Sequence, residues 1–283
     1  MQYQNPQVDE SVNVSQEHPL KEFSQLIIGV GLVLLISIIV LSIISEALAK
    51  RVPFSFEQKM VERIDYFEPS ESATAKQLQA LADRLARHMD LPEEIQLSVH
   101  YQESETVNAL ATLGGNIVFF EGLVEQIESE DELAAVMAHE IAHIKLRHPI
   151  SALGKGLSIT IFATFVSGFS GSTAGDWLIS NSAQLTLMNY SRKQESAADL
   201  LAAQALQAEY GHIRGAQELF KRFESLEAQQ IASKVSVEAF RSHPYSADRW
   251  TDISKQAASS GWLTSGDLTP LSLAGQTKKN GQQ

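Results

Sequence analysis

The chain has 283 residues, of which 44% are hydrophobic and 20% are charged, and its formal net charge is −12. This composition supplies enough apolar residues for a packed core and excludes a wholly disordered chain, while the negative charge argues against nucleic-acid binding, which needs a basic surface. Because the chain has no cysteine, disulfide bonds, cysteine-based metal sites and thiol nucleophiles are excluded.

The first feature along the chain is an uncharged stretch between Glu22 and Glu46, FSQLIIGVGLVLLISIIVLSIIS. About 20 apolar residues are enough to span the hydrocarbon core of a membrane as a helix. A cleaved signal peptide is the alternative, since Ala47-Leu48-Ala49 resembles a cleavage site. The stretch is too long for that alternative, however, and the segment before it is acidic rather than short and basic. We therefore predict a polar tail over 1–22 and one transmembrane helix over 23–45.

The basic residues near this helix lie mostly on its C-terminal side, where Lys50, Arg51, Lys59 and Arg63 follow it and only Lys21 precedes it. Cytoplasmic flanks of membrane helices are enriched in lysine and arginine. We therefore predict that residues 46–69 form a connector to a C-terminal domain on the cytoplasmic side.

Residues 70–263 are expected to form that domain. Apolar residues at helical spacing from Leu78 to Met89 predict a helix that Ser70 or Ser72 caps. Alternation in IQLSVHY (95–101) and the apolar run NIVFFEGL (116–123) predict two strands. The acidic residues at 130–132 mark the start of a long helix that reaches about Arg147.

The rest of the chain is less regular. The apolar run LSITIFATFVSGF (157–169) is short for a membrane span. It predicts a buried or membrane-surface helix, and a shallow membrane hairpin with 177–188 is the alternative. Further helices are expected over about 191–209 and 212–230. From Thr264 to the end of the chain, glycine, serine, glutamine and lysine predominate, which predicts a disordered tail over 264–283.

The long helix contains AVMAHEIAHIKLRH (135–148). His139 and His143 are four residues apart, so on a helix both imidazoles lie on one face and can reach a single ion. Zinc prefers such nitrogen ligands and keeps one position open for water in a catalytic site. Glu140 is placed to take a proton from that water. Because HExxH has only three fixed letters, chance matches are common, and a third ligand must support it.

Two candidates for the third ligand follow. His148 lies five residues beyond His143 and points about 140° away on a helix of 3.6 residues per turn, so we interpret it as a helix-end residue. In YSRKQESAADLLAAQAL, Glu195 and Asp199 share one face of a predicted helix. Glu195 can supply the third ligand, and Asp199 can accept a hydrogen bond from a ligating histidine. An ordinary acidic surface would explain the two acids alone, but together with HExxH they favour a metal site.

HEIAH followed by ESAAD resembles the gluzincin branch of zinc peptidases, and more narrowly the HtpX-type and CAAX-prenyl-endopeptidase-type family of membrane-associated metallopeptidases. TVNALATLGGNIVFFEGLV (106–124) resembles the family's Asn-Ala segment with the edge strand after it, and SHPYSADR (242–249) its His-Pro-x-x-x-x-Arg element. The resemblance covers about residues 70–255. It implies an α+β, mostly helical zincin-type metallopeptidase domain with a small edge-strand β-sheet, here preceded by one transmembrane helix.

The resemblance also implies roles for single residues. Glu140 would be the general base and acid, and Asp199 would orient a ligand. His243 would either stabilise the oxyanion of the tetrahedral intermediate or be a fourth zinc ligand in a closed, resting enzyme. Arg249 would be an ion-pair partner or line the site. One zinc ion per chain would be bound by His139, His143 and Glu195.

Substrate would bind as an added strand on the edge of the sheet. This predicts substrate contacts for Asn108, Asn116, Ile117, Val118 and Phe119, and an ordinary interior strand is the alternative for 116–120. The single span ahead of the catalytic region departs from the multi-span members of the family, so their intramembrane chamber is not expected.

The function implied is a membrane-anchored zinc endopeptidase that takes protein or peptide substrates, in the quality control of membrane or misfolded proteins. A bacterial-type inner membrane is the expected location. The membrane is the expected partner besides the substrate, no nucleic acid is expected, and the oligomeric state is not encoded in any motif. The alternative from another class is a non-proteolytic, membrane-bound, chaperone-like scaffold that retains the fold.

Overall fold

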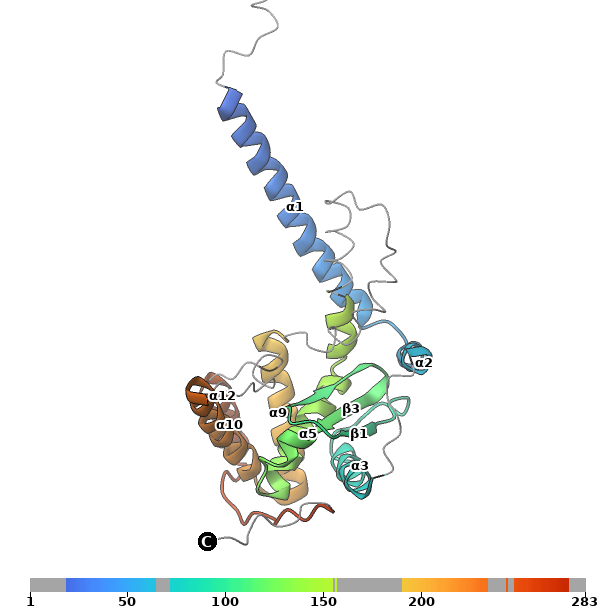
Figure 1. Cartoon of the computed structure of the whole chain (residues 1–283), viewed down its shortest axis with the longest axis vertical. Coiled ribbons are helices and arrows are strands. Elements are labelled where there is room, and N and C mark those ends of the chain that lie inside the picture. Colours follow the sequence, from blue (N-terminus) through green and yellow to red (C-terminus); the bar gives the residue numbers. More distant parts are fainter. Residues whose placement is uncertain are drawn as a thin grey trace, which may run out of the picture.

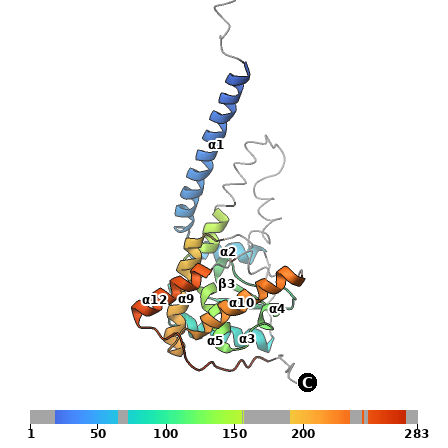
Figure 2. The same ribbon diagram turned by 90° about the vertical axis from the view of Figure 1, so that its left-hand side faces the viewer.

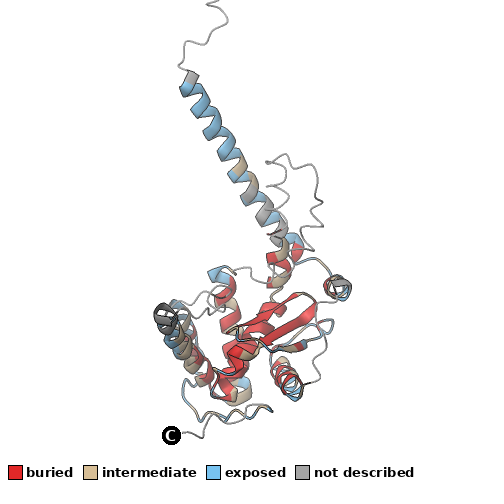
Figure 3. Ribbon diagram, viewed as in Figure 1, coloured by how far each residue is buried: buried red, intermediate tan, exposed pale blue. Residues whose placement is uncertain are grey.

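A computed structural model of the chain describes residues 19–64, 72–154, 156, 190–233, 243 and 247–274. Its longest element, α1 (Pro19–Ala49), projects away from the body of the molecule (Figures 1 and 2). Apolar side chains of α1 are exposed, with Ile28 at 61% and Val33 at 64%, as the pale blue helix of Figure 3 shows. Among the described residues, α1 is the one helix long and apolar enough to cross a membrane. It contains the predicted span of 23–45 and extends beyond it at both ends.

The connector after α1 is more ordered than we expected. The chain turns at residues 50–53 and enters a second helix, α2 (Phe54–Ile64). Phe54 and Glu57 are buried, at 1% and 3% exposure, and α2 packs against the short helix η2 (Leu113–Gly115). Part of the predicted connector is therefore built into the main domain. Residues 65–71 lie outside the described part of the chain.

The predicted helix near Leu78 is present as α3 (Ala73–Ala86). Ser72 caps it, because its side chain accepts a hydrogen bond from the Ala75 backbone amide, which satisfies a donor that has no partner inside the helix. Leu78, Leu81 and Leu85 form its buried face. This face packs on the sheet and on the central helix α5 (Glu130–Lys145).

A three-stranded sheet contains β1 (Ser98–Gln102), β2 (Ala109–Ala111) and β3 (Asn116–Phe120). The strand order is β1-β3-β2, with β1 parallel and β2 antiparallel to β3. β1 begins later than predicted, and the end of the predicted second strand belongs to the short helix α4 (Glu121–Val124). The strand β2 was not predicted.

The expectation that β3 is the edge of the sheet is wrong. Its backbone pairs with β1 on one side and with β2 on the other, so no edge is left for a substrate strand. The contacts predicted for Asn116, Ile117, Val118 and Phe119 are therefore corrected: these residues form the interior strand. The cause is visible in the run NIVFF, since strands buried on both faces are continuously apolar rather than alternating.

The remaining helices are α9 (Arg192–Tyr210), α10 (Arg214–Ser233) and α12 (Ala247–Ser260). α5 is buried along nearly its whole length and lies between the sheet with α3 on one side and α9 with α10 on the other (Figures 1 and 3). α9 begins with a capping box in which Ser191 and Gln194 each bond the other's backbone amide. The fold is thus mostly helical with a small sheet, as predicted.

Residues 264–274 are packed against the domain, so the expected disorder from Thr264 is wrong for this part. The Thr269 carbonyl accepts from the Glu130 amide, and the Thr269 amide donates to the Asp131 carboxylate. The Ala274 amide donates to the Gln77 side chain. In this polar segment, hydrogen bonds to the domain replace hydrogen bonds to water. Composition alone does not reveal such partners. Residues 275–283, and the predicted helix or membrane hairpin within 157–188, lie outside the described residues.

Candidate metal centre

The centre is built around the two histidines of α5. His139 and His143 lie one turn apart on the same face, and their Nε2 atoms are 2.9 Å from each other. His143 is fully buried, at 0% exposure. Burial, together with the neighbouring rings of His139 and His243, holds the pKa of His143 well below its ordinary value. A neutral ring at this position is the form that binds a metal.

The helix α9 brings Glu195 to these rings. Its two carboxylate oxygens lie 3.5 Å from the Nε2 atoms of His139 and His143, one oxygen on each. α5 and α9 pack against each other and both carry buried alanines, such as Ala142 and Ala198; small side chains of this kind let two helix backbones approach closely. The alanine-rich sequence of α9 is therefore what places Glu195, in the helix's first turn, beside α5.

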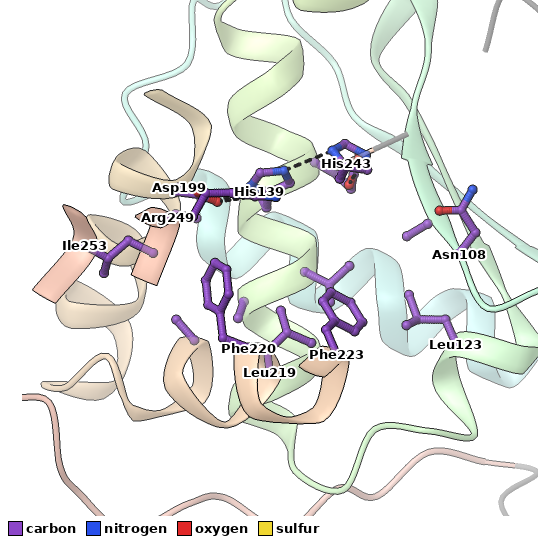
Figure 4. A pocket seen from close by; sticks show the side chains of 16 residues that line it. Asn108, Leu123, His139, Asp199, Leu219, Phe220, Phe223, His243, Arg249 and Ile253 are labelled. Atoms are coloured by element: carbon purple, nitrogen blue, oxygen red, sulfur yellow. Dashed lines mark hydrogen bonds and ion pairs between the residues drawn. The ribbon is translucent and has the colours of Figure 1, made fainter. Parts of the chain in front are cut away.

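His243 joins the group from a third part of the chain. Its Nδ1 atom lies 3.0 Å from Glu195 Oε1 and 3.3 Å from His139 Nε2, and Figure 4 shows the two rings side by side. Its other nitrogen, Nε2, lies 3.5 Å from Glu140 Oε1. Each member of the group offers one ligand atom, and these atoms lie within 4.8 Å of one another; the members are His139, His143, Glu195 and His243.

This donor set fits a divalent metal ion. Nitrogen atoms that bind one tetrahedral ion at the usual bond length are roughly 3.3 Å apart, close to the separations seen here. The buried carboxylate of Glu195 lies among these ring nitrogens, so the group attracts a positive charge, which either a proton or a metal cation can supply. Glu140 adds a further sign, because its buried Oε2 atom has no hydrogen-bond partner among the described residues.

A second layer of contacts holds His139. Asp199 lies one turn after Glu195 on α9, and its Oδ1 atom is 3.0 Å from His139 Nδ1. Arg249 of α12 bonds both Asp199 oxygens and lies 3.0 Å from Glu195 Oε2. Burial opposes the charge of Asp199, but Arg249 and His139 outweigh it and hold its pKa below the ordinary value. The geometry is the one expected for Asp199, and Arg249 both pairs with it and lines the site.

The carboxylates of Asp199 and Glu195 also set the pKa of His139. Burial opposes its positive charge, yet the hydrogen bonds to Asp199 and Glu195 prevail and raise its pKa to about 10 in the absence of a metal. The two carboxylates thus create strong negative potential at the ring. A metal cation at His139 Nε2 benefits from the same potential.

The structure corrects the interpretation of His148. The helix α5 ends at Lys145, and Arg147 has a left-handed backbone with φ of 60°. The estimate of 140° assumed a continuous helix, whereas this turn brings the His148 ring back to His143, with their Nδ1 atoms 2.9 Å apart. His148 is buried at 5% exposure and is not among the four ligand candidates.

Sequence reasoning also missed Tyr190. Its ring stacks on that of His143, with centroids 4.1 Å apart and an interplanar angle of 24°. Burial, with help from Glu140 and Glu195, raises the pKa of Tyr190 well above its ordinary value, so its hydroxyl stays protonated. Tyr190 directly precedes the SRKQESAAD segment, and this was the only feature of the sequence that could have placed it near the metal centre.

A mostly apolar pocket opens beside the candidate ligands (Figure 4). His139, Glu140 and His243 form one wall, and Asn108 and Ala109, at the start of the edge strand β2, also line it. Its apolar lining includes Leu123, Val136, Leu219, Phe220, Phe223 and Ile253. Of the predicted substrate contacts, Asn108 is the one that the structure places at the site.

Comparison with known proteins agrees with this geometry. The family model described as "Peptidase family M48" matches residues 72–257. The chain is 26% identical over 177 residues to the mitochondrial metalloendopeptidase OMA1 of Schizosaccharomyces pombe, an alignment that covers 62% of this chain and 51% of that protein. It is 32% identical over 120 residues to the beta-barrel assembly-enhancing protease of Yersinia pestis, covering 37% of this chain and 23% of that protein.

A third relative is matched over more of its length. The metalloprotease LoiP of Escherichia coli K12 is 26% identical over 196 residues, which is 68% of this chain and 74% of LoiP. The chain thus spans about half the length of the OMA1 relative and less than a quarter of the assembly-enhancing protease.

Proposed function

This chain belongs to peptidase family M48 and is a metallopeptidase, and from that premise we propose that it is a membrane-anchored, zinc-dependent endopeptidase that cleaves unfolded or misfolded proteins. The observation that carries the proposal is the convergence of three ligand atoms beside an acid and a pocket. His139, His143 and Glu195 hold one zinc ion, and Glu140 lines the apolar pocket beside them.

Each residue has a task in this proposal. When bound, zinc supplies a Lewis acid and lowers the pKa of water at the site. Glu140 takes the proton of the attacking water and delivers it to the leaving amine, for which its buried, unpartnered Oε2 is available. Asp199 accepts the Nδ1–H of His139 and fixes the tautomer that leaves Nε2 for the metal, and Arg249 holds Asp199 in place.

For His243 we propose the role of fourth ligand in a closed, resting enzyme. Its Nδ1 atom lies among the other ligand atoms, where the attacking water must bind. A donor to the oxyanion would instead be expected beside the substrate carbonyl, away from the other ligands. Release of His243 would then open the site.

Substrate binding is assigned to β2 rather than to β3. Among the described strands β2 is at an edge, pairing with β3 alone, and it leads directly from Asn108 into the pocket wall. A peptide added along this edge gains backbone hydrogen bonds that depend little on its sequence. The apolar pocket then takes one large apolar side chain next to the scissile bond. Unfolded proteins expose such side chains, whereas folded ones bury them.

The membrane part of the proposal rests on α1. Its exposed apolar surface and its length suit a membrane span, and the basic residues after it favour a cytoplasmic catalytic domain. The relatives include a mitochondrial metalloendopeptidase and a protease that enhances β-barrel assembly. These names support a role in the quality control of membrane or misfolded proteins.

The test uses the full chain purified in detergent micelles, with an unfolded model protein as substrate. We expect about one zinc ion per chain by elemental analysis, cleavage of the substrate, loss of both on treatment with a strong chelator, and recovery of both when zinc is returned. Purified protein that holds zinc yet never cleaves would overturn the proposal in favour of a chaperone-like scaffold. Cleavage that persists without metal would also overturn it.

A further inference from the structure

The second nitrogen of His143 has a partner that family membership does not assign. In the proposed metal centre, Nε2 of His143 faces the ion, so Nδ1 carries the ring's proton and needs an acceptor. That acceptor is His148, whose own Nδ1 lies 2.9 Å away. The two metal-binding histidines therefore have different supports: a carboxylate from Asp199 for His139, and a second imidazole for His143.

The position of His148 depends on the turn that precedes it. Arg147 has φ of 60°, a conformation that residues other than glycine adopt only rarely. Arg147 lies just beyond the end of α5 and turns the chain so that the ring of His148 meets the ring of His143. A right-handed Arg147 would continue the helix and point His148 away from His143, so some contact must hold the left-handed backbone in place.

The contacts that hold Arg147 come from residues 52–57, which include the end of the turn after α1 and the first residues of α2 and are called the juxtamembrane segment below. Its guanidinium forms an ion pair of 2.7 Å with the buried Glu57, donates to the Val52 carbonyl and lies 5.4 Å over the ring of Phe54. Glu57 also accepts a hydrogen bond from the Gly114 amide at 3.1 Å. The juxtamembrane segment is thereby fixed to the domain at the very turn that places His148.

We propose that His148 is a positioning residue for the metal ligand His143, and that residues 52–57 of the juxtamembrane segment support the metal centre through Arg147. The segment that leaves the membrane helix is then part of the metal site's framework rather than a passive tether. This inference rests on the proposed function only in requiring that the wild-type chain binds a metal.

The first experiment measures the affinity of the full chain for Zn²⁺ by competition with a chromophoric chelator. His148→Leu keeps an apolar body of similar size without an acceptor, and His148→Asn keeps an acceptor near the position of Nδ1. We expect binding about 10- to 100-fold weaker for His148→Leu and largely restored for His148→Asn. His88→Leu, at a histidine that pairs with Glu209 outside the site, is the matched control and should bind as wild type.

The outcomes separate this inference from the proposed function. Wild-type protein that binds no Zn²⁺ removes the proposed function, whereas wild-type affinity in His148→Leu overturns only the role of His148. The visible absorption of the Co²⁺-substituted protein reports ligand geometry, and we expect it to change in His148→Leu and to return in His148→Asn. Thermal unfolding of the metal-free variants checks that each one folds.

The second experiment tests whether the juxtamembrane segment supports the metal centre. Its main variant leaves His148 unchanged. Glu57→Gln keeps an acceptor for Gly114 but removes the charge that faces Arg147. We expect it to weaken Zn²⁺ binding several-fold when His148 is present and to have no further effect in His148→Leu, because the two changes act on one path. Glu128→Gln, which removes a surface partner of Arg222, is the control. Wild-type affinity in Glu57→Gln overturns the link, and so does an equal effect in both backgrounds.

Discussion

Arg249 donates two hydrogen bonds of 2.7 Å to Asp199, one to each carboxylate oxygen. The same carboxylate lies 3.0 Å from Nδ1 of His139. A residue of α12 thereby fixes a residue of α9, which in turn orients a ring on α5. The proposed metal centre is accordingly a product of how three helices pack, and it can be weakened by changing Asp199, which is not itself one of the proposed ligands.

Asp199→Asn tests this relay. The amide can still contact His139, but it loses the negative charge and the paired geometry with Arg249. We expect Zn²⁺ affinity to fall about 10- to 100-fold, measured by chelator competition. Asp252→Asn on α12, an exposed aspartate that pairs with Lys255, should leave the affinity unchanged. Wild-type affinity in Asp199→Asn would show that the relay has no effect on the metal.

Glu195→Ala tests the third ligand. Glu195 is the one negatively charged member of the four proposed ligands, and its removal should sharply lower the zinc content of the purified variant, as measured by elemental analysis, and abolish detectable cleavage. Glu209→Ala is the control, because Glu209 lies on the same helix but pairs with Arg84 and His88. Full zinc content in Glu195→Ala would rule out Glu195 as a ligand.

His243→Ala distinguishes the two roles considered for this residue. If His243 blocks the water position in the resting enzyme, the variant keeps its zinc on the other three ligands and cleaves an unfolded substrate faster than wild type, which is the result we expect. Loss of a donor to the oxyanion would instead lower turnover by about 10²-fold or more. Initial rates measured at equal zinc content decide between the two.

The apolar pocket predicts a cleavage preference. We expect large apolar residues to be enriched on one side of the bonds cut in an unfolded protein, as determined by mass spectrometry of the fragments. Phe223→Asp places a charge in the pocket and should lower kcat/KM for such sites by about 10- to 200-fold. Lys221→Asp, at an exposed position on the same helix, is the matched control. Cleavage sites without apolar enrichment would mean that the pocket does not bind a side chain.

The part of the centre that could be predicted from the sequence is the part encoded by helical periodicity. His139 and His143 are four residues apart, as are Glu195 and Asp199, and each pair shares a helix face whatever the rest of the fold does. The resemblance to the metallopeptidases added His243, which local pattern alone does not connect to α5. The structure brings all five residues together.

What could not be predicted depends on tertiary contacts. The three residues of β2 are too few to show a strand pattern, so the strand order and the true edge of the sheet were missed. The turn at Arg147 depends on Glu57, ninety residues earlier in the chain, and without it His148 points away from His143. Thr269 and Ala274 belong to a polar segment whose order depends on partners in α3 and α5.

The most direct test of the account is Glu140→Gln. The substitution keeps the size of the side chain and removes the base, so we expect the purified full chain to retain its zinc while cleavage of an unfolded protein falls by about 10²- to 10⁴-fold. A variant that holds zinc and cleaves as fast as wild type would contradict the account at its centre, because it would show that Glu140 is not the general base.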